Sequence, residues 1–511
     1  MTMRSSSVYG PSVRPSNIHD AFARVAEANP HRVAARDGDR SLTYGRIAAD
    51  ARRVATWLRR AGVGSGDLVP VISNRDIDLP AVLLGILSTG AAYGMLDPRW
   101  PALRHAHLLD SVAPAVVVAE TTAAAELDTR GVPLVTTDEL LRSPDQPQPR
   151  IVVHPQQGAA VFWTSGSTGA PKGVLSPHQA TTRLFATPPF LEYGPEPVVI
   201  HAAAVAWDAF SLELWGALLR GGTLLVHARD LLLPNDIRAH IRDGAATHLF
   251  LTPALAEVVV GGDVDCLAGL RCLMLGGDKP DPHTCERLLS TYPNLKLING
   301  YGPVESCVFA TTHPITTADI ARAQPIPAGS PVPGTGVHIV ADDGPLPAGE
   351  TGEVALSGTG IALGYLGDPA STKAAFRTLD IDGRPVRVYL TGDRGRIDAA
   401  GLLHFSGRGD SQIKVSGHRI EPAEIEAAAR AVGARRAVVL PRHDKSGNPQ
   451  LILFAEVHTA ELTEAGLHAR LREHLPAYMI PARVHILTDM PLLDNTKIDK
   501  KRLTEQYGFP A

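Results

Sequence analysis

Short apolar segments alternate with helical segments over the first 300 residues, and this alternation limits the possible folds more than any other feature of the chain. Residues 41–63 carry apolar side chains at helical spacing after Thr43, a residue type that often caps helices, and a second helix is predicted at 80–87. Predicted strands lie at 67–72, 115–119, 198–203, 222–227, 248–251, 271–275 and 296–299. Such alternation is typical of parallel sheets covered by helices. The sequence therefore predicts an α/β fold with two helix-flanked, mostly parallel sheets.

The pattern changes at about residue 325. The segment 325–336 is rich in proline and glycine, which mark turns. Strands are predicted after it at 337–340, 353–356 and 386–390. We therefore expect a β-subdomain over about 325–409, as the last part of a large N-terminal core that spans 1–409.

The last hundred residues are predicted to form a small α+β domain. Helices are expected at 422–431 and 462–474, with strands between them. The boundary is placed at Gly409-Asp410-Ser411, so the C-terminal domain spans 410–511.

Composition excludes several classes of function. The 511 residues are 44% hydrophobic and 20% charged, which is ordinary for a globular protein with a large core. A net charge of −4 gives no electrostatic reason to expect nucleic acid or a membrane surface as a partner. Four cysteines without metal-binding spacing disfavour a metal cluster and are usual for a reducing cytosol. With neither a signal peptide nor an apolar run long enough for a membrane span, we expect a soluble, cytoplasmic protein.

One segment, Thr164 to Gly173, carries the strongest chemical signal. It follows an apolar run and holds four hydroxyl side chains, three glycines and Lys172. Glycines let a backbone approach a bulky anion, while hydroxyls, amides and a lysine donate to phosphate oxygens. The spacing matches neither the common P-loop nor the dinucleotide fingerprint. The segment therefore predicts a phosphate-binding loop of another class, with a flexible surface loop as the alternative for such a stretch taken alone.

The order of residues in this loop resembles the ATP-binding signature of the adenylate-forming superfamily. That superfamily includes acyl-CoA synthetases, luciferases and the amino-acid adenylation domains of nonribosomal peptide synthesis. Further segments resemble the family in the same order along nearly the whole chain: Leu42-Thr43-Tyr44, Leu96 to Pro101, Asn299 to Glu305, Gly352-Glu353-Val354, Thr391-Gly392-Asp393, Phe405 to Glu426 and Pro491 to Lys500. Each motif alone is weak evidence for the family, but all of them together in this order are strong evidence. The resemblance implies a small, mobile C-terminal domain that turns about Asp410 as its hinge.

The same resemblance implies a site for ATP with Mg²⁺. Tyr301 would flank the adenine, and Asp393 would accept the ribose hydroxyls with help from Arg408. Glu305 would bind Mg²⁺, and Lys497 stands at the position of the catalytic lysine. The implied nucleotide-binding residues are Thr164, Ser165, Gly166, Ser167, Thr168, Gly169, Lys172, Asn299, Gly300, Tyr301, Gly302, Asp393 and Arg408.

Three positions depart from the family pattern. Val304 stands where the family usually has a threonine that contacts the α-phosphate, and Thr168 is a candidate to replace that contact in catalysis. Ser416 and Thr496 replace a usual arginine and a usual glycine.

The segment Trp207 to Glu213 favours amino-acid adenylation over acyl-CoA synthesis. It resembles the segment in which peptide-synthetase domains place an aspartate for the substrate's α-ammonium, and Asp208 stands at that position. A carboxylate among apolar residues is costly without a cationic partner. A helix N-cap aspartate is the alternative. The segment Asp97 to Pro101 and the form of the hinge segment also resemble those domains.

The resemblance also gives the positions that would surround the substrate. They are Asp208, Ala209, Leu212, Phe250, Met274, Gly276, Gly300, Val308, Phe309 and Lys497. Asp208 and Lys497 would hold the ammonium and carboxylate of an α-amino acid, while the other eight offer no charge or hydrogen-bonding side chain. A polar substrate side chain would lose its water without gaining partners. Two glycines are expected to leave space, while Phe250, Met274 and Phe309 fill part of it, so the set predicts a small branched aliphatic side chain and looks most like those assigned to valine. Isoleucine, leucine and 2-aminobutyrate remain open.

These expectations combine into a freestanding enzyme of nonribosomal peptide synthesis, with an excised domain of a larger synthetase as the alternative. It would form an aminoacyl-AMP and then transfer the aminoacyl group to the pantetheine thiol of a separate carrier protein, with a small activator protein as a further possible partner. Two alternatives remain at this point. An acyl- or aryl-CoA ligase would use an acid without an amine, and a non-catalytic member of the family would bind nucleotide without releasing pyrophosphate.

Overall fold

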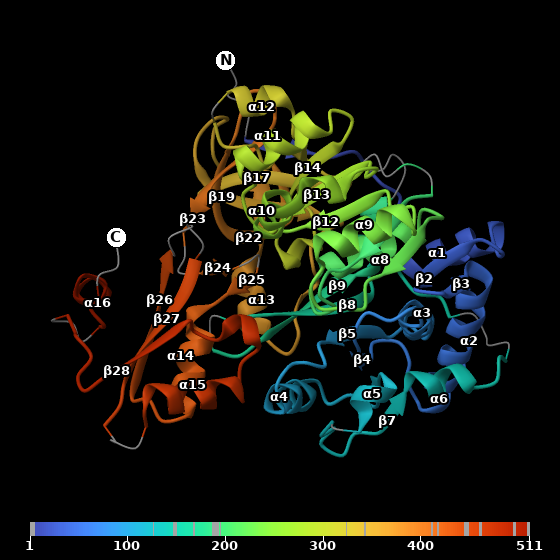
Figure 1. Cartoon of the computed structure of the whole chain (residues 1–511), viewed down its shortest axis with the longest axis horizontal. Coiled ribbons are helices and arrows are strands. Elements are labelled where there is room, and N and C mark those ends of the chain that lie inside the picture. Colours follow the sequence, from blue (N-terminus) through green and yellow to red (C-terminus); the bar gives the residue numbers. More distant parts are fainter. Residues whose placement is uncertain are drawn as a thin grey trace. The chain divides into compact units, whose positions relative to one another are not determined.

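The computed structural model describes residues 6–507 except 126, 147–150, 167–168, 186–193, 195, 323, 342–343, 410–411, 416–417, 444–448, 459–461 and 494–496. Contacts divide the chain into two compact units. The larger comprises Met1–Pro98, Val112–Trp163 and Gly173–Asp410. The smaller comprises Arg99–Ser111, Thr164–Lys172 and Ser411–Ala511. The elements of both are labelled in Figure 1.

A nine-stranded sheet in the larger unit has the order β16-β15-β14-β13-β12-β10-β11-β2-β3. Its strands are β2 (Val33–Asp37), β3 (Arg40–Thr43), β10 (Val198–His201), β11 (Thr223–Val226), β12 (His248–Leu251), β13 (Cys272–Gly276), β14 (Lys296–Tyr301), β15 (Thr311–Pro314) and β16 (Ser330–Pro331). The pairs from β14 to β2 are parallel, while β15, β16 and β3 join antiparallel. Parallel strands end at the same edge of a sheet, where ligands of such folds bind, and Gly276 and Tyr301 are the last residues of β13 and β14.

A second sheet has seven strands in the order β20-β9-β8-β5-β4-β6-β7. They are β4 (Leu68–Ile72), β5 (Ala92–Leu96), β6 (Val117–Ala119), β7 (Leu134–Thr136), β8 (Gly158–Thr164), β9 (Lys172–Pro177) and β20 (Gly364–Tyr365). The run from β8 through β5, β4 and β6 to β7 is parallel, and β20 pairs antiparallel with β9. The predicted phosphate loop is the connection from Thr164 at the end of β8 to Lys172 at the start of β9.

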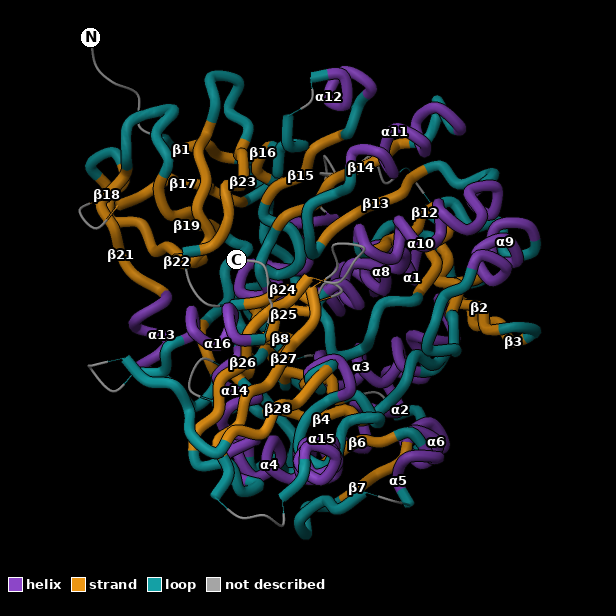
Figure 2. The backbone as a smooth tube through the Cα atoms, turned by 60° about the vertical axis from the view of Figure 1, so that its left-hand side comes forward, coloured by secondary structure: helices purple, strands orange, loops and turns teal. Residues whose placement is uncertain are grey.

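A third sheet is antiparallel throughout and lies mostly within the residues of the expected β-subdomain. Its strands are β1 (Ser7–Tyr9), β17 (Thr335–Ala341), β18 (Gly344–Pro345), β19 (Gly352–Gly358), β21 (Phe376–Ile381), β22 (Arg384–Ile397) and β23 (Leu403–Arg408). Figure 2 shows these strands, including β1, which the sequence did not predict. β1 adds as an edge strand because Ser7 to Tyr9 pairs with β17.

The helices of the larger unit connect these strands and include the two predicted from the sequence. They are α1 (Ile18–Ala28), α2 (Tyr44–Arg60), α3 (Leu79–Ser88), α5 (Thr121–Ala124), α6 (Thr137–Arg142), α7 (His178–Thr182), α8 (Ala209–Leu218), α9 (Pro234–Arg242), α10 (Pro253–Asp263), α11 (Pro282–Thr291), α12 (Thr317–Ala321) and α13 (Pro369–Ala375), with 3₁₀ turns η1 (Arg183–Phe185), η2 (Val264–Leu267) and η3 (Val304–Ser306). As predicted, α2 begins after Thr43, whose side chain accepts a hydrogen bond from the Arg46 N–H.

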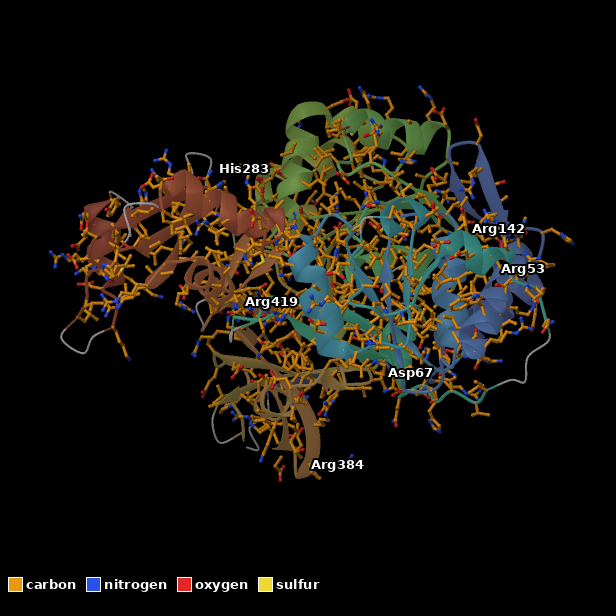
Figure 3. All side chains as sticks on the ribbon, turned by 90° about the horizontal axis from the view of Figure 1, so that it is seen from below. Arg53, Asp67, Arg142, His283, Arg384 and Arg419 are labelled. Atoms are coloured by element: carbon orange, nitrogen blue, oxygen red, sulfur yellow. The ribbon has the colours of Figure 1, made fainter. Side chains whose placement is uncertain are left out.

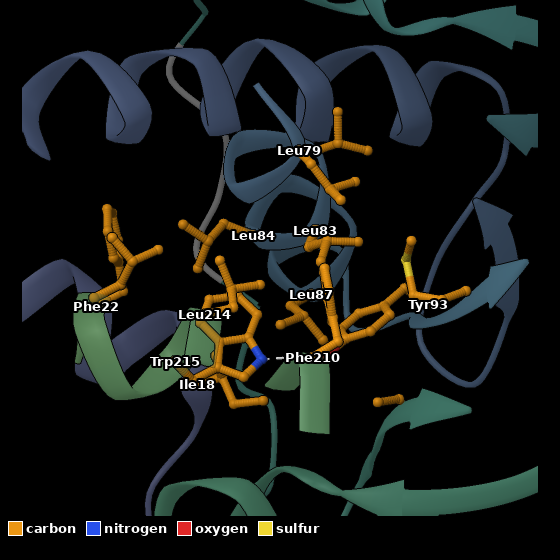
Figure 4. Close-up of a cluster of buried hydrophobic side chains, with 14 of the residues drawn as sticks. Ile18, Phe22, Leu79, Leu83, Leu84, Leu87, Tyr93, Phe210, Leu214 and Trp215 are labelled. Carbon is orange, nitrogen blue, oxygen red and sulfur yellow. Dashed lines mark hydrogen bonds between the residues drawn. The ribbon is translucent and has the colours of Figure 1, made fainter. Parts of the chain in front are cut away.

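The main core of the larger unit lies where α1, α3 and α8 meet the strand β5. Figure 4 shows Phe22, Leu87 and Trp215 in this cluster, and the indole N–H of Trp215 donates to the Tyr93 hydroxyl at 3.3 Å. Burial of these large apolar side chains stabilises the unit. Because α8 begins directly after Asp208, the same packing fixes the start of that helix.

The smaller unit is an α+β structure with its own core. Its elements are β24 (Ile413–Val415), β25 (His418–Ile420), β26 (Arg436–His443), β27 (Pro449–Glu456), β28 (Arg483–Leu487), α4 (Ala102–Val112), α14 (Pro422–Ala431), η4 (Ala477–Met479), α15 (Glu464–Arg472) and α16 (Lys500–Gln506). β26 and β27 pair antiparallel, and β28 pairs parallel with β27. Ile425, Leu453 and Leu467 are fully buried in its hydrophobic cluster.

The structure confirms the predicted α/β class and the predicted alternation of elements. The assignment of two segments to the domains differs from the prediction. The sequence analysis placed them in the N-terminal core, but they cluster with the C-terminal residues: Arg99–Ser111 and Thr164–Lys172. No helix in the described ranges combines the length and the apolar character that crossing a lipid bilayer demands.

Asp67, Arg142 and Arg384 are exposed charged side chains of the larger unit, labelled in Figure 3.

Candidate active site

Three of the predicted nucleotide-binding residues meet in the larger unit. Asp393 on β22 lies opposite Arg408 on β23 in the antiparallel register. The Asp393 carboxylate accepts hydrogen bonds from the Tyr301 hydroxyl at 2.7 Å and from the Arg408 guanidinium. Burial and the charge of Asp393 raise the pKa of Tyr301 well above its usual value, so this phenol stays a neutral donor. A carboxylate has about four lone-pair sites, so Asp393 keeps acceptor capacity for a diol.

Glu305 lies nearby in the chain, in the 3₁₀ turn η3. Its side chain is 1% exposed, and one carboxylate oxygen accepts a hydrogen bond from the Tyr365 hydroxyl at 2.8 Å. Its backbone carbonyl accepts the Ala362 N–H at 2.8 Å. Two contacts from one neighbouring segment therefore hold Glu305, through its backbone and through its side chain.

Other predicted nucleotide positions of the larger unit serve the fold as well. The Asn299 amide donates to the Pro327 carbonyl at 2.8 Å, so this side chain fastens β14 to a neighbouring loop. A Cβ at Gly302 would lie 2.3 Å from the Val308 carbonyl oxygen, which leaves room only for glycine. Both residues therefore shape the turn that follows β14.

Asp208 occupies the N-cap position of α8, but its side chain does not cap that helix. Instead, a carboxylate oxygen accepts the Val308 N–H at 2.8 Å. Burial raises the pKa of Asp208 to about 6, the Val308 N–H lowers it, and the charge of Glu305 raises it further. The N-cap alternative therefore does not account for this side chain, because its backbone donor comes from a segment a hundred residues away.

Phe309 changes the interpretation of the two glycines among the substrate positions. A Cβ at Gly300 would lie 2.3 Å from the Phe309 ring, and a Cβ at Gly276 would lie 2.9 Å from it. The aromatic ring therefore lies where side chains at these two positions would be. The glycines make room for Phe309, which fills space that they would otherwise leave.

The remaining substrate positions of the larger unit are apolar and buried. Leu212 and Met274 are 0% exposed, and the rings of Phe250 and Phe309 lie with centroids 6.3 Å apart. Ala209 and Val308 are buried as well. These side chains can offer dispersion contacts but no hydrogen bonds.

The predicted phosphate loop belongs to the smaller unit, where its described donors have protein partners. The Ser165 hydroxyl donates to the carbonyl of Arg419 (labelled in Figure 3) at 2.7 Å and accepts the Glu421 N–H at 2.9 Å. Thr164 is buried and hydrogen-bonds within the loop, to the Lys172 carbonyl. Two predicted positions, Ser167 and Thr168, lie outside the described residues.

A buried ion pair stands beside this loop. Arg104 on α4 and Glu424 on α14 form a salt bridge of 2.6 Å, with side chains 4% and 3% exposed. The second oxygen of Glu424 accepts the Gly166 N–H at 3.3 Å. Gly169 lies against the same helix, where its added Cβ would be 2.7 Å from that of Ala427. A carboxylate is therefore bound by a loop amide of the kind expected to bind phosphate.

Lys497 is an exposed residue of the smaller unit. Its carbonyl accepts the Leu493 N–H at 2.8 Å, and Ile498 bridges to Leu492. The predicted hinge, Asp410, lies outside the described residues. Among the described residues, no group of three or more His, Cys, Asp or Glu side chains has a metal-binding arrangement.

A family model described as AMP-binding enzyme matches residues 22–366. The chain belongs to this family. Malpibaldin synthetase of Mortierella alpina is 35% identical over 96% of the chain, and surfactin synthase subunit 3 of Bacillus subtilis (strain 168) is 31% identical over 96%. The chain spans only 9% and 39% of these two relatives. It thus corresponds to a part of each.

Comparison with a solved structure identifies the fold. PA1221, an NRPS protein containing adenylation and PCP domains, superimposes with a TM-score of 0.86 at 31% identity, covering 97% of this chain and 98% of that one. The protein is therefore an adenylation domain of the nonribosomal peptide synthetase type, an AMP-forming ligase. Its fold has a large N-terminal and a small C-terminal domain, as predicted.

Sequence reasoning missed several residues of this adenylation domain. Tyr365 binds Glu305, and Arg104 pairs with Glu424, although no motif in the sequence marks either residue. A lone tyrosine or arginine carries no local pattern that reveals a partner far along the chain. Arg183 was missed for the same reason; it is fully buried and donates to the carbonyls of Ser306 and Phe309.

Proposed function

We propose that this adenylation domain activates a small branched aliphatic α-amino acid, with valine as the first choice, to its aminoacyl-AMP. The observation that carries the proposal is Asp208, an ionisable carboxyl held by the Val308 N–H among buried apolar residues. A buried carboxylate gains most from a cationic partner, and an α-ammonium is such a partner. The apolar neighbours Leu212 and Met274 suit an aliphatic side chain.

Phe309 supports a small substrate side chain in this proposal. Its ring takes the volume that Gly276 and Gly300 would otherwise offer, so large aromatic substrates are disfavoured. Valine, isoleucine, leucine and 2-aminobutyrate differ by one or two methylenes, each worth about 1–3 kcal/mol of discrimination. Valine is the first choice because the set of positions looks most like those assigned to valine, and the other three are near competitors because these differences are small.

For the nucleotide, we propose that Asp393 binds the ribose hydroxyls while Tyr301 flanks the adenine. The two remaining lone-pair directions of the Asp393 carboxylate match a vicinal diol, and Tyr301 and Arg408 orient that carboxylate. Mg²⁺ accompanying ATP would neutralise phosphate charge. A single buried carboxylate, Glu305, fits this ion because Mg²⁺ commonly takes one or two carboxylates together with substrate phosphates and waters.

In the proposed reaction the substrate carboxylate attacks the α-phosphorus of ATP in line, and pyrophosphate leaves. Asp208 holds the α-ammonium, which orients the carboxylate for attack. Lys497 stabilises the charge that develops on the oxygens around the α-phosphorus. The loop from Thr164 to Lys172, with Ser167 and Thr168, steadies the departing pyrophosphate through backbone amides and hydroxyls.

A second step is proposed in which the aminoacyl group passes to the pantetheine thiol of a carrier protein. The thiol sulfur attacks the acyl carbon, the thioester bond forms, and AMP leaves. PA1221, the structural neighbour, contains a PCP domain beside its adenylation domain, which supports a partner of this kind. We propose that the C-terminal domain turns about Asp410 between the two steps, so that Lys497 withdraws and the thiol gains access.

Amino-acid-dependent exchange between ATP and labelled pyrophosphate tests the first step. The panel comprises the twenty standard amino acids, 2-aminobutyrate, β-alanine, octanoate and benzoate. We expect exchange that peaks at valine or an aliphatic neighbour. Exchange only with acids that lack an α-amine would refute the role of Asp208. Transfer to a carrier protein is then tested by mass spectrometry of the loaded pantetheine arm.

A further inference from the structure

Arg183 is a fully buried arginine that none of the predicted roles uses. It lies in η1 of the larger unit and is 1% exposed. Its guanidinium donates to the carbonyls of Ser306 at 2.7 Å, Phe309 at 2.6 Å and Cys307 at 3.4 Å. Three of its bonds therefore go to one short segment, 306–309, which links Glu305 to the substrate positions.

The other partners of Arg183 are neutral as well. Its guanidinium also donates to the Ala180 carbonyl and to the Thr335 hydroxyl at 3.2 Å. Within the described ranges no carboxylate forms an ion pair with it. Burial lowers the pKa of Arg183 to about 10, which still leaves a cation at neutral pH. A buried cation without an anionic partner is costly, so the contacts it makes need an explanation beyond charge pairing.

The segment that Arg183 binds has an unusual backbone. Cys307 and Val308 have φ values of 54° and 67°, in the left-handed region. This region is uncommon for residues other than glycine and especially for a β-branched valine. Such a conformation persists only where its surroundings hold it. The guanidinium supplies that hold through the carbonyls on both sides of the two residues.

One peptide group joins Arg183 to Asp208. The carbonyl between Cys307 and Val308 faces the Arg183 guanidinium, and the N–H of the same peptide donates to the Asp208 carboxylate at 2.8 Å. The positive charge stands at the oxygen end of the peptide dipole and the negative charge at its N–H end. This arrangement is electrostatically favourable and fixes the direction of the N–H that orients Asp208.

The same guanidinium fixes Phe309, whose ring lies over Gly276 and Gly300. Glu305, at the other end of the segment, is held separately by Tyr365 and by the Ala362 N–H. Loss of the Arg183 contacts should therefore disturb the side of the site that faces the amino acid more than the side that binds ATP.

We propose that Arg183 is a positioning residue for the amino-acid substrate, setting both the Asp208 carboxylate and the Phe309 ring through the backbone of 306–309. This inference rests on the proposed amino-acid activation and adds a specificity determinant outside the set of positions that would surround the substrate. Arg183 acts on both through backbone carbonyls, those of Cys307 and Phe309.

Two variants test the inference in the full chain. Arg183→Lys keeps the charge but loses the planar set of donors that spans three carbonyls. Gly360→Ala leaves the arginine intact and places a Cβ 2.4 Å from its Nε, which displaces the guanidinium. Arg75→Lys is the matched control, because Arg75 is also buried and donates to the carbonyls of His227 and Arg229.

The readout is the KM of each substrate in ATP–pyrophosphate exchange, together with the thermal unfolding midpoint. For Arg183→Lys and Gly360→Ala we expect the KM for the amino acid to rise about tenfold or more, with the KM for ATP changed less than about twofold. We also expect the preference for the best amino acid over its nearest homologue to shrink. Arg75→Lys should lower the unfolding midpoint and leave both KM values near those of the parent protein.

Each other outcome overturns the inference. Equal rises in the KM for the amino acid and for ATP would show a general loss of structure. Unchanged KM values in a less stable Arg183→Lys would show a purely structural arginine. If Arg183→Lys fails to fold, Gly360→Ala decides by the same criteria. A parent protein that exchanges with no amino acid would refute the proposed function itself, and the inference with it, before any variant is compared.

Discussion

Protonation of Asp208 should weaken the use of an amino acid below neutral pH. Burial raises the pKa of this carboxyl to about 6. With that value, about nine-tenths of the carboxyl is ionised at pH 7 and about one-tenth at pH 5. Because kcat/KM reports the ionisation of the free enzyme, we expect kcat/KM for the amino acid to fall about tenfold over this interval. kcat/KM falls toward low pH because the protonated carboxyl has no charge to attract the α-ammonium.

The assay is the initial rate of ATP–pyrophosphate exchange at saturating ATP between pH 5 and pH 8. The parallel profile of kcat/KM for ATP serves as reference, because it contains the ionisations of the phosphates. Asp208→Asn is the matched variant, since its amide oxygen still accepts the Val308 N–H but carries no charge. Removing one charge of a buried pair costs about 3–5 kcal/mol, so kcat/KM for the amino acid should drop at pH 7 by about two to three and a half orders of magnitude.

An Asp208→Asn variant that keeps the acidic limb of the parent profile would refute this reasoning, because another group would then be titrating. A deaminated analogue, 3-methylbutanoate, provides an independent check. It lacks the ammonium, so protonation of Asp208 removes an uncompensated charge beside it. Its use relative to valine should therefore rise as the pH falls.

Three further predictions concern catalysis and stability. Lys497→Ala should lower kcat for exchange by about 10²–10³ while ATP still binds, as measured by exchange rates and by calorimetry with ATP. Gly300→Ala should raise the KM for the preferred amino acid and lower the unfolding midpoint, because its Cβ would lie 2.3 Å from the Phe309 ring and overpacking costs about 1–3 kcal/mol. Arg104→Met should destabilise the smaller unit by about 3–5 kcal/mol, since it leaves the Glu424 carboxylate buried and unpaired. Hydrogen exchange of the α14 amides should show that loss, and Glu424→Gln in the same chain should recover most of it.

The elements of the fold were predictable because their signals are local. Thr43 precedes the helix that it caps, and the strands β12, β13 and β14 are visible in the sequence as short apolar runs. The meeting of Asp393 and Arg408 was implied only by family resemblance. The structure gives it a physical basis, because the antiparallel register of β22 and β23 sets the two residues opposite each other.

Long-range contacts were not predictable in this way. The Phe309 ring lies where a Cβ of Gly300 would be, whereas the residue types predicted only that Phe309 fills part of the space that the glycines leave. The loop Thr164–Lys172 clusters with residues more than two hundred positions later, through the contacts of Ser165 and Gly166. These features depend on which surfaces meet, and a list of side-chain types does not specify that.

The segment after β14 shows why the proposed substrate and metal roles stand so close in the chain. Glu305 and Val308 are three residues apart, but separate neighbours hold them: Tyr365 binds the first, and Asp208 binds the second through its N–H. Arg183 lies behind the peptide between Cys307 and Val308, and Asp208 lies in front. With a bound amino acid, the ammonium, Asp208, the peptide dipole and Arg183 would form a row of alternating charge. In such a row each member stabilises the next, so the cost of burying Arg183 is offset most fully when the substrate is present.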